Sequence, residues 1–249
     1  MPAHDFLSNF ILRLRKCAYG LRTPLCRRGL RLGIGASIEH LSALKGKRIR
    51  TIVDVGANRG QFALFAHTEF PDAQVISFEP LSAPSQRFES LFKGEQRVCL
   101  HRRGLGQRCE PRSMHVTQQD DSSSIYPPGR LQTANFGTVE IASENIEVVR
   151  LDSILNRSEI ERPALLKIDT QGYELEVILG CGDMLSSFDY IYVELSFVEL
   201  YKGQPLFDDV ESILLSRGFR VAGVYNQSTS KNGTALQADF LFANREILD

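Results

Sequence analysis

The amino-acid sequence predicts an α/β fold with a doubly wound, mostly parallel sheet and an antiparallel last strand. Residues 51–66 pass from a β-branched apolar run, across a glycine-containing turn, into apolar residues at helical spacing. Strand-like and helix-like segments then alternate up to residue 101, which predicts parallel strands joined by crossover helices. Near the C-terminus, two strand-like runs flank the turn-rich residues 226–233, which predicts a hairpin and therefore an antiparallel final strand.

Length and composition favour one globular domain with an N-terminal extension. The chain has 249 residues and a hydrophobic fraction of 43%, enough for one α/β core. Its net charge is −1, yet residues 1–50 hold eleven Lys and Arg against Asp5 and Glu39. The remaining, acidic part does not favour a nucleic-acid partner. We therefore divide the chain into a cationic helical extension, 1–49, and a domain, 50–249, with an insertion near 106–145.

Cysteine content and hydropathy point to a cytoplasmic protein. The five cysteines form no C-x-x-C pair, so free thiols in a reducing compartment are expected rather than disulfides or a zinc site. The chain has no run of about 18 apolar residues, so no membrane span is expected. Nothing in the composition predicts an oligomeric state.

The extension begins with an expected amphipathic helix over residues 5–22, ended by Pro24. Its apolar positions follow a spacing of three to four residues, at Phe6, Phe10, Leu14, Cys17 and Leu21. Two interpretations remain open. The helix packs on the domain as a lid, or residues 1–31 contact an anionic membrane surface or an anionic substrate. Residues 23–46 are expected to form a loop or a short helix.

The domain begins with two strand–helix units. A β-branched run predicts a strand over 51–55, and the helical spacing that follows predicts a helix over about 60–69, closed by Pro71. The next strand is expected at 74–78, its helix at about 83–92, and the third strand near 97–101.

Residues 106–150 interrupt this alternation. The segments 113–117 and 146–150 alternate between apolar and polar residues like an antiparallel pair. Between them lies a polar tract, 120–124, followed by Pro127-Pro128-Gly129. We expect a loop insertion, which either covers a site or is disordered.

The alternation then resumes with an expected strand at 164–168. A helix extends to about residue 179, and a strand at 190–194 ends in an acid. A helix over about 207–217 is closed by Gly218. The last two strands are expected at 219–225 and 237–242.

The turn after the first strand is expected to bind a nucleotide-like cofactor. Gly56, Asn58 and Gly60 favour a tight turn at a helix N-terminus, where backbone comes close to a ligand. A dinucleotide fingerprint needs a third glycine that is absent here. Asp54, which precedes the turn, suits a cationic ligand such as S-adenosylmethionine. A βαβ unit with a tight turn and no ligand remains the simpler alternative.

An acid ends the second strand. The apolar run 75–78 leads into Glu79-Pro80, nineteen residues past Gly60. A carboxylate at this position accepts hydrogen bonds from both ribose hydroxyls of a bound nucleotide. We therefore add Glu79 and Pro80 to the expected cofactor site.

Two further acids, Asp169 and Glu194, end the strands 164–168 and 190–194. Since side chains alternate along a strand, Lys167 and Asp169 share one face. An alcohol is a weak nucleophile until its proton leaves, so a base beside the reacting carbon helps. Asp169 is our first candidate for that base and for cofactor contact, Glu194 the second, and Lys167 would keep Asp169 charged. The alternative is a structural ion pair.

Other candidates are weaker. His101 and His115 are isolated in the sequence and are more simply explained as structural residues. The chain lacks tryptophan, so stacking on a sugar would rely on tyrosine or phenylalanine, such as Tyr126 or Phe197.

Together, four motifs resemble the FkbM-type S-adenosylmethionine-dependent methyltransferases. The motifs are Asp54-Val-Gly-Ala-Asn-Arg-Gly60, Phe78-Glu79-Pro80, Leu151-Asp-Ser-Ile-Leu155 and Lys167-Ile-Asp-Thr-Gln-Gly-Tyr-Glu174. The resemblance covers about residues 50–245. It implies the class I methyltransferase fold, with seven strands and the last antiparallel, and O-methylation of a sugar, glycan or other secondary metabolite. Where this chain has Gln171 the family often has an acid, which weakens any metal role there, and we predict no metal site.

Two rival functions remain open at the level of sequence. A binding protein that keeps the cofactor fold without turnover is the first alternative. A nicotinamide-dependent oxidoreductase is the second, disfavoured by the missing third glycine. Residues 1–49 and the insertion match no motif and are expected to determine the acceptor.

Overall fold

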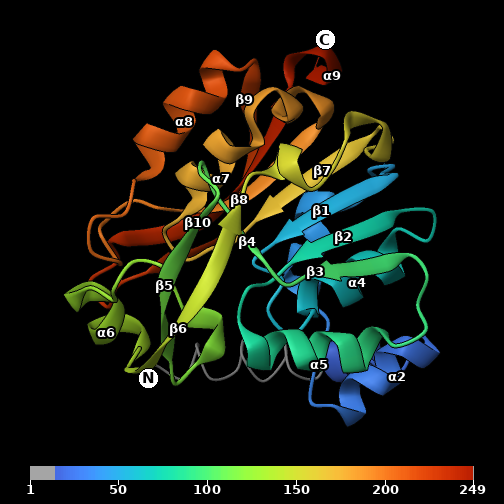
Figure 1. Ribbon diagram of the computed structural model, residues 1–249, viewed down its shortest axis with the longest axis horizontal. Helices are drawn as coiled ribbons and strands as arrows, with labels where there is room; N and C mark the ends of the chain where they lie inside the picture. The colour runs from blue at the N-terminus through green and yellow to red at the C-terminus, as the bar shows by residue number, and fades with distance from the viewer. Residues whose placement is uncertain (1–14, 249) are drawn as a thin grey trace.

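A seven-stranded sheet forms the centre of the protein, whose computed structural model describes residues 15–248 (Figure 1). In spatial order the strands are β3 (Val98–His101), β2 (Gln74–Phe78), β1 (Thr51–Val55), β7 (Ala164–Ile168), β8 (Tyr190–Ser196), β10 (Ala235–Asn244) and β9 (Phe219–Thr229). The first five are mutually parallel, and β10 runs antiparallel to both β8 and β9. The predicted fold class is confirmed, with the last strand inserted between its two neighbours.

Helices cover both faces of this sheet. The helices that cover it are α4 (Gln61–Glu69), α5 (Ser82–Phe92), α7 (Glu174–Cys181) and α8 (Phe207–Ser216). Alternate side chains of β1 point to opposite faces of the sheet. Val53 and Val55 pack into one apolar core with α7 and α8, whereas Ile52 packs into a second core with α4 and α5. In Figure 1, α7 and α8 lie in the upper part of the molecule and α5 in the lower part.

The N-terminal segment is part of the second of these cores. Residues 15–19 are helical, and α2 (Pro24–Arg31), η1 (Ile38–His40) and α3 (Leu41–Leu44) follow. Pro24 opens α2, and the side chain of Thr23 accepts a hydrogen bond from the backbone N–H of Cys26. Leu25 and Ile34 are buried against α4 and α5. The expected positions Phe6, Phe10 and Leu14 lie outside the described residues.

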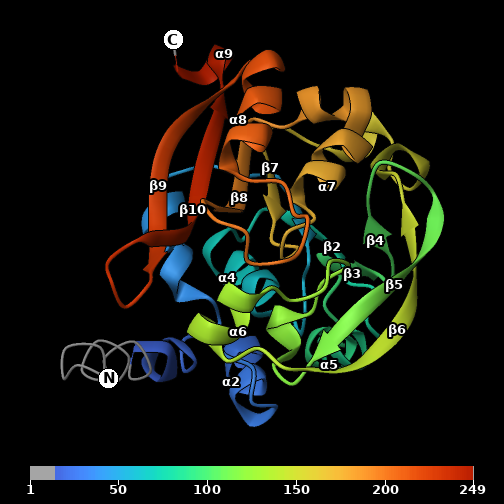
Figure 2. The same cartoon turned by 90° about the vertical axis from the view of Figure 1, so that its left-hand side faces the viewer.

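The insertion is built from ordered elements. Its sheet has the order β4 (Gly104–Leu105), β6 (Glu140–Val149), β5 (Glu110–Thr117), and it stands to the right in Figure 2. The predicted antiparallel pair is present in longer strands, with Ser113 opposite Asn145. The expected loop contains η2 (Asp120–Ser122) and α6 (Arg130–Phe136), which ends at Gly137 with a φ of 70°. Because Gln132 is buried and donates a hydrogen bond to the hydroxyl of Tyr201, this stretch is anchored to the domain.

The remaining turns and helices connect these parts. They are η3 (Leu151–Ser153), η4 (Arg157–Glu159), η5 (Gly182–Ser187) and α9 (Arg245–Leu248). The second sheet is joined to α5 by Glu144, whose carboxylate accepts a hydrogen bond from the backbone N–H of Ser82 at 3.0 Å. Within residues 15–248, no helix combines the length and the hydropathy needed to cross a membrane.

Candidate active site at the carboxyl ends of the strands

A cavity of about 380 Å³ opens at the carboxyl ends of β1, β2, β7 and β8. It is enclosed by the turn after β1, by the second sheet and by the N-terminal segment. The predicted site residues that line it are Gly56, Asn58, Glu79, Pro80, Lys167, Asp169 and Glu194. Asp54 and Gly60 do not line it, and neither do His101, His115, Tyr126 and Phe197.

The turn between β1 and α4 has the left-handed backbone that its sequence predicts. Gly56, Asn58 and Gly60 have φ angles of 78°, 47° and 91°. A Cβ atom on Gly56 would lie 1.8 Å from the carbonyl oxygen of Asp169. Only glycine therefore lets this turn pass so close to the end of β7. The turn exposes backbone to the cavity at the N-terminus of α4.

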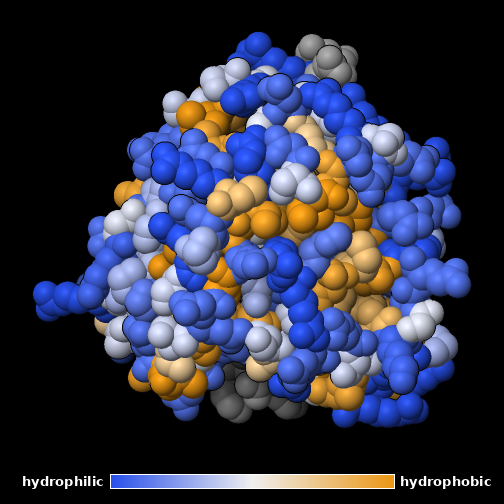
Figure 3. All heavy atoms as spheres, in the orientation of Figure 1, coloured by the Kyte–Doolittle hydropathy of each residue, from blue (hydrophilic) through white to orange (hydrophobic). Residues whose placement is uncertain are grey.

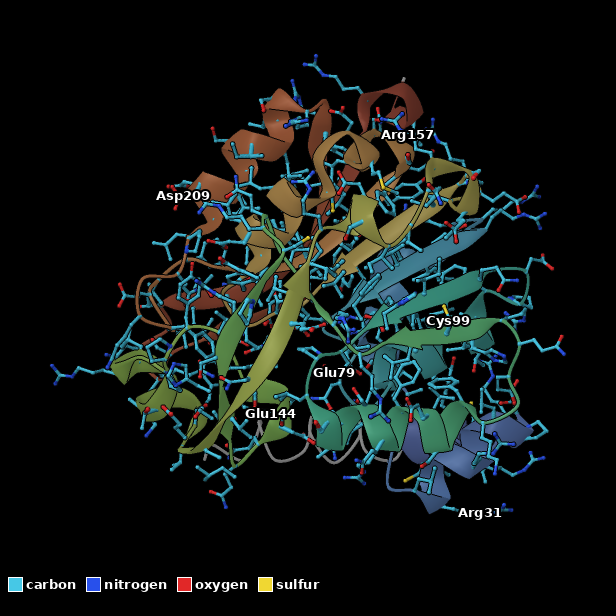
Figure 4. All side chains as sticks on the ribbon, viewed as in Figure 1. Arg31, Glu79, Cys99, Glu144, Arg157 and Asp209 are labelled. Atoms are coloured by element: carbon cyan, nitrogen blue, oxygen red, sulfur yellow. The ribbon has the colours of Figure 1, made fainter. Side chains whose placement is uncertain are left out.

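Glu79 is buried at the tip of β2, near the middle of the molecule (Figure 4). Its Oε2 accepts a hydrogen bond from the N–H of Asn58, and its Oε1 from the N–H of Leu81, both at 2.9 Å. Burial raises the pKa of Glu79 to about 7, although these two backbone donors oppose the shift. Each carboxylate oxygen has a further lone pair, so the group can also accept bonds from a ligand at the cavity.

Asp54 lies behind the wall of the cavity rather than on it. Its side chain is fully buried, and its Oδ1 is 3.2 Å from the Nζ of Lys167. Lys167 also lies 3.7 Å from the Oδ2 of Asp169 and 3.3 Å from the carbonyl oxygen of Gly56. Burial disfavours the charged ammonium, but the two carboxylates outweigh it and raise the pKa of Lys167. Asp54 thus holds Lys167, which in turn faces Asp169.

Asp169 and Glu194 are joined by the side chain of Gln171. The Nε2 of Gln171 donates to Asp169 Oδ1 at 2.8 Å and to Glu194 Oε2 at 3.1 Å. The hydroxyl of Tyr201 bonds to its Oε1 at 2.7 Å. The φ of Gln171 is 56°, a left-handed conformation that aims this amide between the two acids. Gln171, which stands where the family often has an acid, therefore connects the two carboxylates of the site.

The loop that carries Asp169 and Gln171 is held from beneath by Glu174. The buried Oε1 of Glu174 accepts hydrogen bonds from the N–H groups of Thr170 and Gly172, at 2.9 and 3.0 Å. Burial raises the pKa of Glu174 to about 7, against these backbone donors. In the sequence, Glu174 stands out only as the last residue of the fourth motif, and these backbone contacts were not predicted.

Glu194 and Asp169 differ in burial and in electrostatic environment. Burial, together with the charges of Asp169 and Asp239, raises the pKa of Glu194 well above the ordinary value. Asp169 is more open, with 41% of its side chain exposed. The two acids therefore differ in environment, as acids with different proton-transfer roles do.

Sequence reasoning missed a polar cluster at the β8–β10 side of the cavity. The Oδ2 of Asp239 accepts hydrogen bonds from Tyr192 at 2.8 Å and Asn226 at 2.7 Å, and lies 3.4 Å from the Nδ1 of His40. Burial opposes ionisation, but these donors prevail and lower the pKa of Asp239. Asp239 lies opposite Glu194 in the pairing of β10 with β8. The register of these strands was therefore the one sequence signal that could have placed Asp239 at the cavity.

The cavity fits S-adenosylmethionine, the cofactor expected from the sequence. Glu79 offers acceptor capacity for ribose hydroxyls beside a turn whose Gly56 leaves no room for a Cβ. Apolar side chains line the wall by β2 and the second sheet, at Leu81, Leu105, Met114 and Ile146. No group of three or more His, Cys, Asp or Glu side chains within residues 15–248 is arranged to hold a metal ion.

Comparison with known proteins gives a family match over most of the domain. A family model described as the methyltransferase FkbM domain matches residues 54–221. The chain is 28% identical to Methyltransferase 1 of Beauveria bassiana, covering 69% of this chain and 72% of that one. It is 28% identical to the 2-O-methyltransferase NoeI of Sinorhizobium fredii, over 77% and 79%. It is 26% identical to the 31-O-demethyl-FK506 methyltransferase FkbM of Streptomyces tacrolimicus, over 88% and 94%.

Proposed function

The chain belongs to the FkbM methyltransferase family, and from this premise we propose that it methylates a hydroxyl oxygen of a sugar, a glycan or another secondary metabolite. S-adenosylmethionine is the methyl donor. The observation that carries the proposal is the pair Asp169 and Glu194, bridged by Gln171 on the wall of the cavity that Glu79 also lines. Carboxylates on a cavity wall accept hydrogen bonds from hydroxyl groups.

Several of the predicted cofactor residues receive a proposed role from their positions. Glu79 accepts hydrogen bonds from the ribose hydroxyls, and Pro80 and Leu81 continue that wall. The backbone from Gly56 to Asn58 adjoins the cofactor. Asp54 acts indirectly, because it holds Lys167 from behind.

The proposed reaction is an in-line displacement. S-adenosylmethionine supplies an electrophilic methyl group. As the acceptor oxygen forms its bond to the methyl carbon, the carbon–sulfur bond breaks and its electron pair stays on sulfur, giving S-adenosylhomocysteine. Asp169 takes the hydroxyl proton, and Lys167 stabilises its charged form. Positioning supplies most of the remaining acceleration.

Glu194 has a separate proposed role. Burial and the charge of Asp169 raise the pKa of Glu194, which favours its protonated form. A neutral carboxyl group both donates and accepts hydrogen bonds, so it orients a second hydroxyl of the acceptor. Two relatives carry an O-methyl designation in their names, which supports oxygen as the methylated atom.

The proposal is tested by transfer of an isotope-labelled methyl group. Full-length protein is incubated with trideuteromethyl S-adenosylmethionine and fractionated metabolite and glycan extracts, and products are detected by mass spectrometry. We expect a product heavier by one labelled methyl, with an ether linkage in its NMR spectrum. Label on nitrogen or carbon would contradict the hydroxyl acceptor. Tight binding of S-adenosylhomocysteine without any labelled product would favour the non-catalytic binding protein.

We further propose that residues 1–31 contact an anionic membrane surface. Among the described residues of this segment, the side chains of Arg22, Arg27 and Arg31 are exposed, and Figure 4 shows Arg31 extending outward from α2. The apolar residues Leu25 and Cys26 of α2 are buried in the core. The contact of α2 would therefore be electrostatic, without insertion into lipid.

A further inference from the structure

We propose that Lys16 and Glu39, in the N-terminal segment, bind the amino-acid end of S-adenosylmethionine. Glu39 would accept hydrogen bonds from its ammonium group and Lys16 would pair with its carboxylate. This inference rests on the proposed cofactor site and adds a part of it that lies outside the matched residues 54–221.

The N-terminal segment shares the cavity with the cofactor residues. Lys16, Ser37, Glu39 and His40 all line the cavity that Gly56, Asn58 and Glu79 line. The segment is fixed there by the core, since Ile38 and Ala36 are buried beside α4. A further bond joins the N–H of Ser37 to the carbonyl oxygen of Gln61 in the first turn of α4. The segment therefore forms a fixed part of the cavity wall.

The two side chains present opposite charges at one place. The Nζ of Lys16 lies 3.0 Å from both carboxylate oxygens of Glu39, and each side chain is 31% exposed. The amino acid of the cofactor carries an ammonium and a carboxylate on one carbon, so it matches such a pair charge for charge. Nearby on the wall, the Oε1 of Gln61 is buried with no hydrogen-bond partner among the described residues. An ammonium would satisfy that acceptor as well.

Several other charged groups around the cavity pair with neighbours of the sheet, the turn or the insertion. Asp54, which the sequence favoured for a cationic ligand, is buried against Lys167. Lys167 is shared between Asp54 and Asp169. Arg59 pairs with Asp120 at 3.2 Å. The polar N-terminal wall thus offers a cation and an anion that neither the sheet nor the turn provides.

Arg103 is not a candidate for binding the carboxylate of the cofactor, because it is also paired. Its Nε lies 2.7 Å from Glu147 of β6, on the side of the second sheet. That side carries the apolar cluster of Leu81, Ile146 and Val148, which suits a purine ring. His40, in contrast, packs edge-on against Phe62 of α4 and Tyr192 of β8. The two ends of the cavity therefore differ in chemistry, as the two ends of the cofactor do.

Two ligands that differ only at the amino-acid end test the assignment. S-adenosylhomocysteine carries the zwitterion, and 5′-methylthioadenosine lacks it. We expect Lys16→Gln and Glu39→Gln each to weaken S-adenosylhomocysteine binding by about tenfold or more in calorimetry. Binding of 5′-methylthioadenosine should change less than about twofold. Lys45→Gln is the matched control, an exposed lysine of the same segment outside the cavity, and should change neither affinity.

An equal loss for both ligands in the folded Lys16→Gln protein, or no loss for either, would overturn the assignment. A second measurement needs no variant. Lysine-selective acylation of the full-length protein, read by peptide mass spectrometry, should slow at Lys16 when S-adenosylhomocysteine is bound. It should not slow with saturating 5′-methylthioadenosine. Equal labelling of Lys16 with both ligands would contradict the proposal, and neither experiment depends on the methyl acceptor.

Discussion

At the scale of single residues, position at a strand end is what the sequence reveals best. Glu79 and Asp169 were expected at the carboxyl ends of β2 and β7, and both line the cavity. Asp54 was expected there too, yet it is fully buried against Lys167. The alternation of residues along a strand predicts the face of the sheet on which a side chain lies. It does not predict whether a longer neighbouring side chain covers that side chain. Gln171 and Asp239 were missed because their roles depend on contacts between distant segments.

The first prediction concerns Glu79. Glu79→Ala removes the acceptor proposed for the ribose hydroxyls, and a hydrogen bond to a charged group contributes about 1.5–3 kcal/mol. S-adenosylhomocysteine should therefore bind about ten- to a hundredfold more weakly by calorimetry. Glu89→Ala, which removes an exposed carboxylate of α5, is the control and should leave affinity unchanged. Equal affinity in the folded Glu79→Ala protein would remove Glu79 from the cofactor site.

The second prediction concerns the pH dependence of stability through Glu174. Its pKa is about 7 in the folded protein against an ordinary 4.5, so the folded state keeps a proton that the unfolded chain releases. The free energy of unfolding should fall as pH rises from 4.5 to 7. At about 1.4 kcal/mol per pKa unit, the contribution reaches about 3 kcal/mol.

Glu174→Gln tests this directly. Glutamine keeps an oxygen to accept from Thr170 and Gly172 but takes up no proton. Urea unfolding at several pH values should give a flatter curve for the variant than for the natural protein. Parallel curves would show that Glu174 ionises normally in the fold.

At the scale of elements, regular strand–helix units were predictable and the insertion was not. The strands 51–55 and 74–78 appear as expected, because β-branched runs and glycine turns are local signals. The helix α6 was missed, since it is held by long-range contacts such as the bond from Gln132 to Tyr201. A local sequence pattern cannot predict a hydrogen-bond partner 69 residues away.

The third prediction concerns the turn after β1. Gly56→Ala places a Cβ 1.8 Å from the Asp169 carbonyl oxygen at a φ of 78°, so the turn and the end of β7 must separate. We expect a loss of about 3 kcal/mol or more in urea unfolding. Gly94→Ala has a similar φ of 86° but no heavy atom within 4 Å of the added Cβ. It should lose only about 1–2 kcal/mol. Similar losses in both variants would mean that the close approach is easily relaxed.

At the scale of the whole molecule, the N-terminal segment and the sheet form one packed unit. Tyr19, Leu25, Ile34 and Leu44 belong to the same apolar core as α4 and α5. The charge asymmetry of the sequence set this segment apart as an extension, whereas its apolar spacing was the signal for packing on the domain. A second surface feature is apolar: Val139 and Ile141 are 50% and 64% exposed, and Figure 3 shows a hydrophobic patch at the lower left, where β6 begins.

The fourth prediction separates the two interpretations of the N-terminal segment. A chain that begins at Leu44 exposes the part of the core that Leu25, Ile34 and Ile38 cover. We expect it to aggregate or to unfold at a lower temperature, as measured by light scattering and circular dichroism. A chain of full stability that still binds S-adenosylhomocysteine would show that residues 1–43 are dispensable for the fold.

Membrane contact is measured on the full-length protein. If residues 1–31 bind an anionic surface, sedimentation with phosphatidylserine vesicles should occur at low salt and disappear as ionic strength rises. Neutral vesicles are the control. Full-length protein that stays in solution with anionic vesicles at low salt would rule this contact out.

We propose that Asp169 is the base of the methyl transfer and that other residues bind the cofactor. Asp169→Asn keeps the shape of the side chain but cannot take a proton, and loss of a general base costs about 10²–10⁴ in rate. The most direct test compares single-turnover methyl transfer with S-adenosylhomocysteine affinity in Asp169→Asn and Glu194→Gln. We expect Asp169→Asn to lose turnover by that factor with affinity little changed, and Glu194→Gln to lose less turnover. Intact turnover in Asp169→Asn, or a loss of cofactor affinity in place of the loss of turnover, would contradict the assignment of Asp169 as the base.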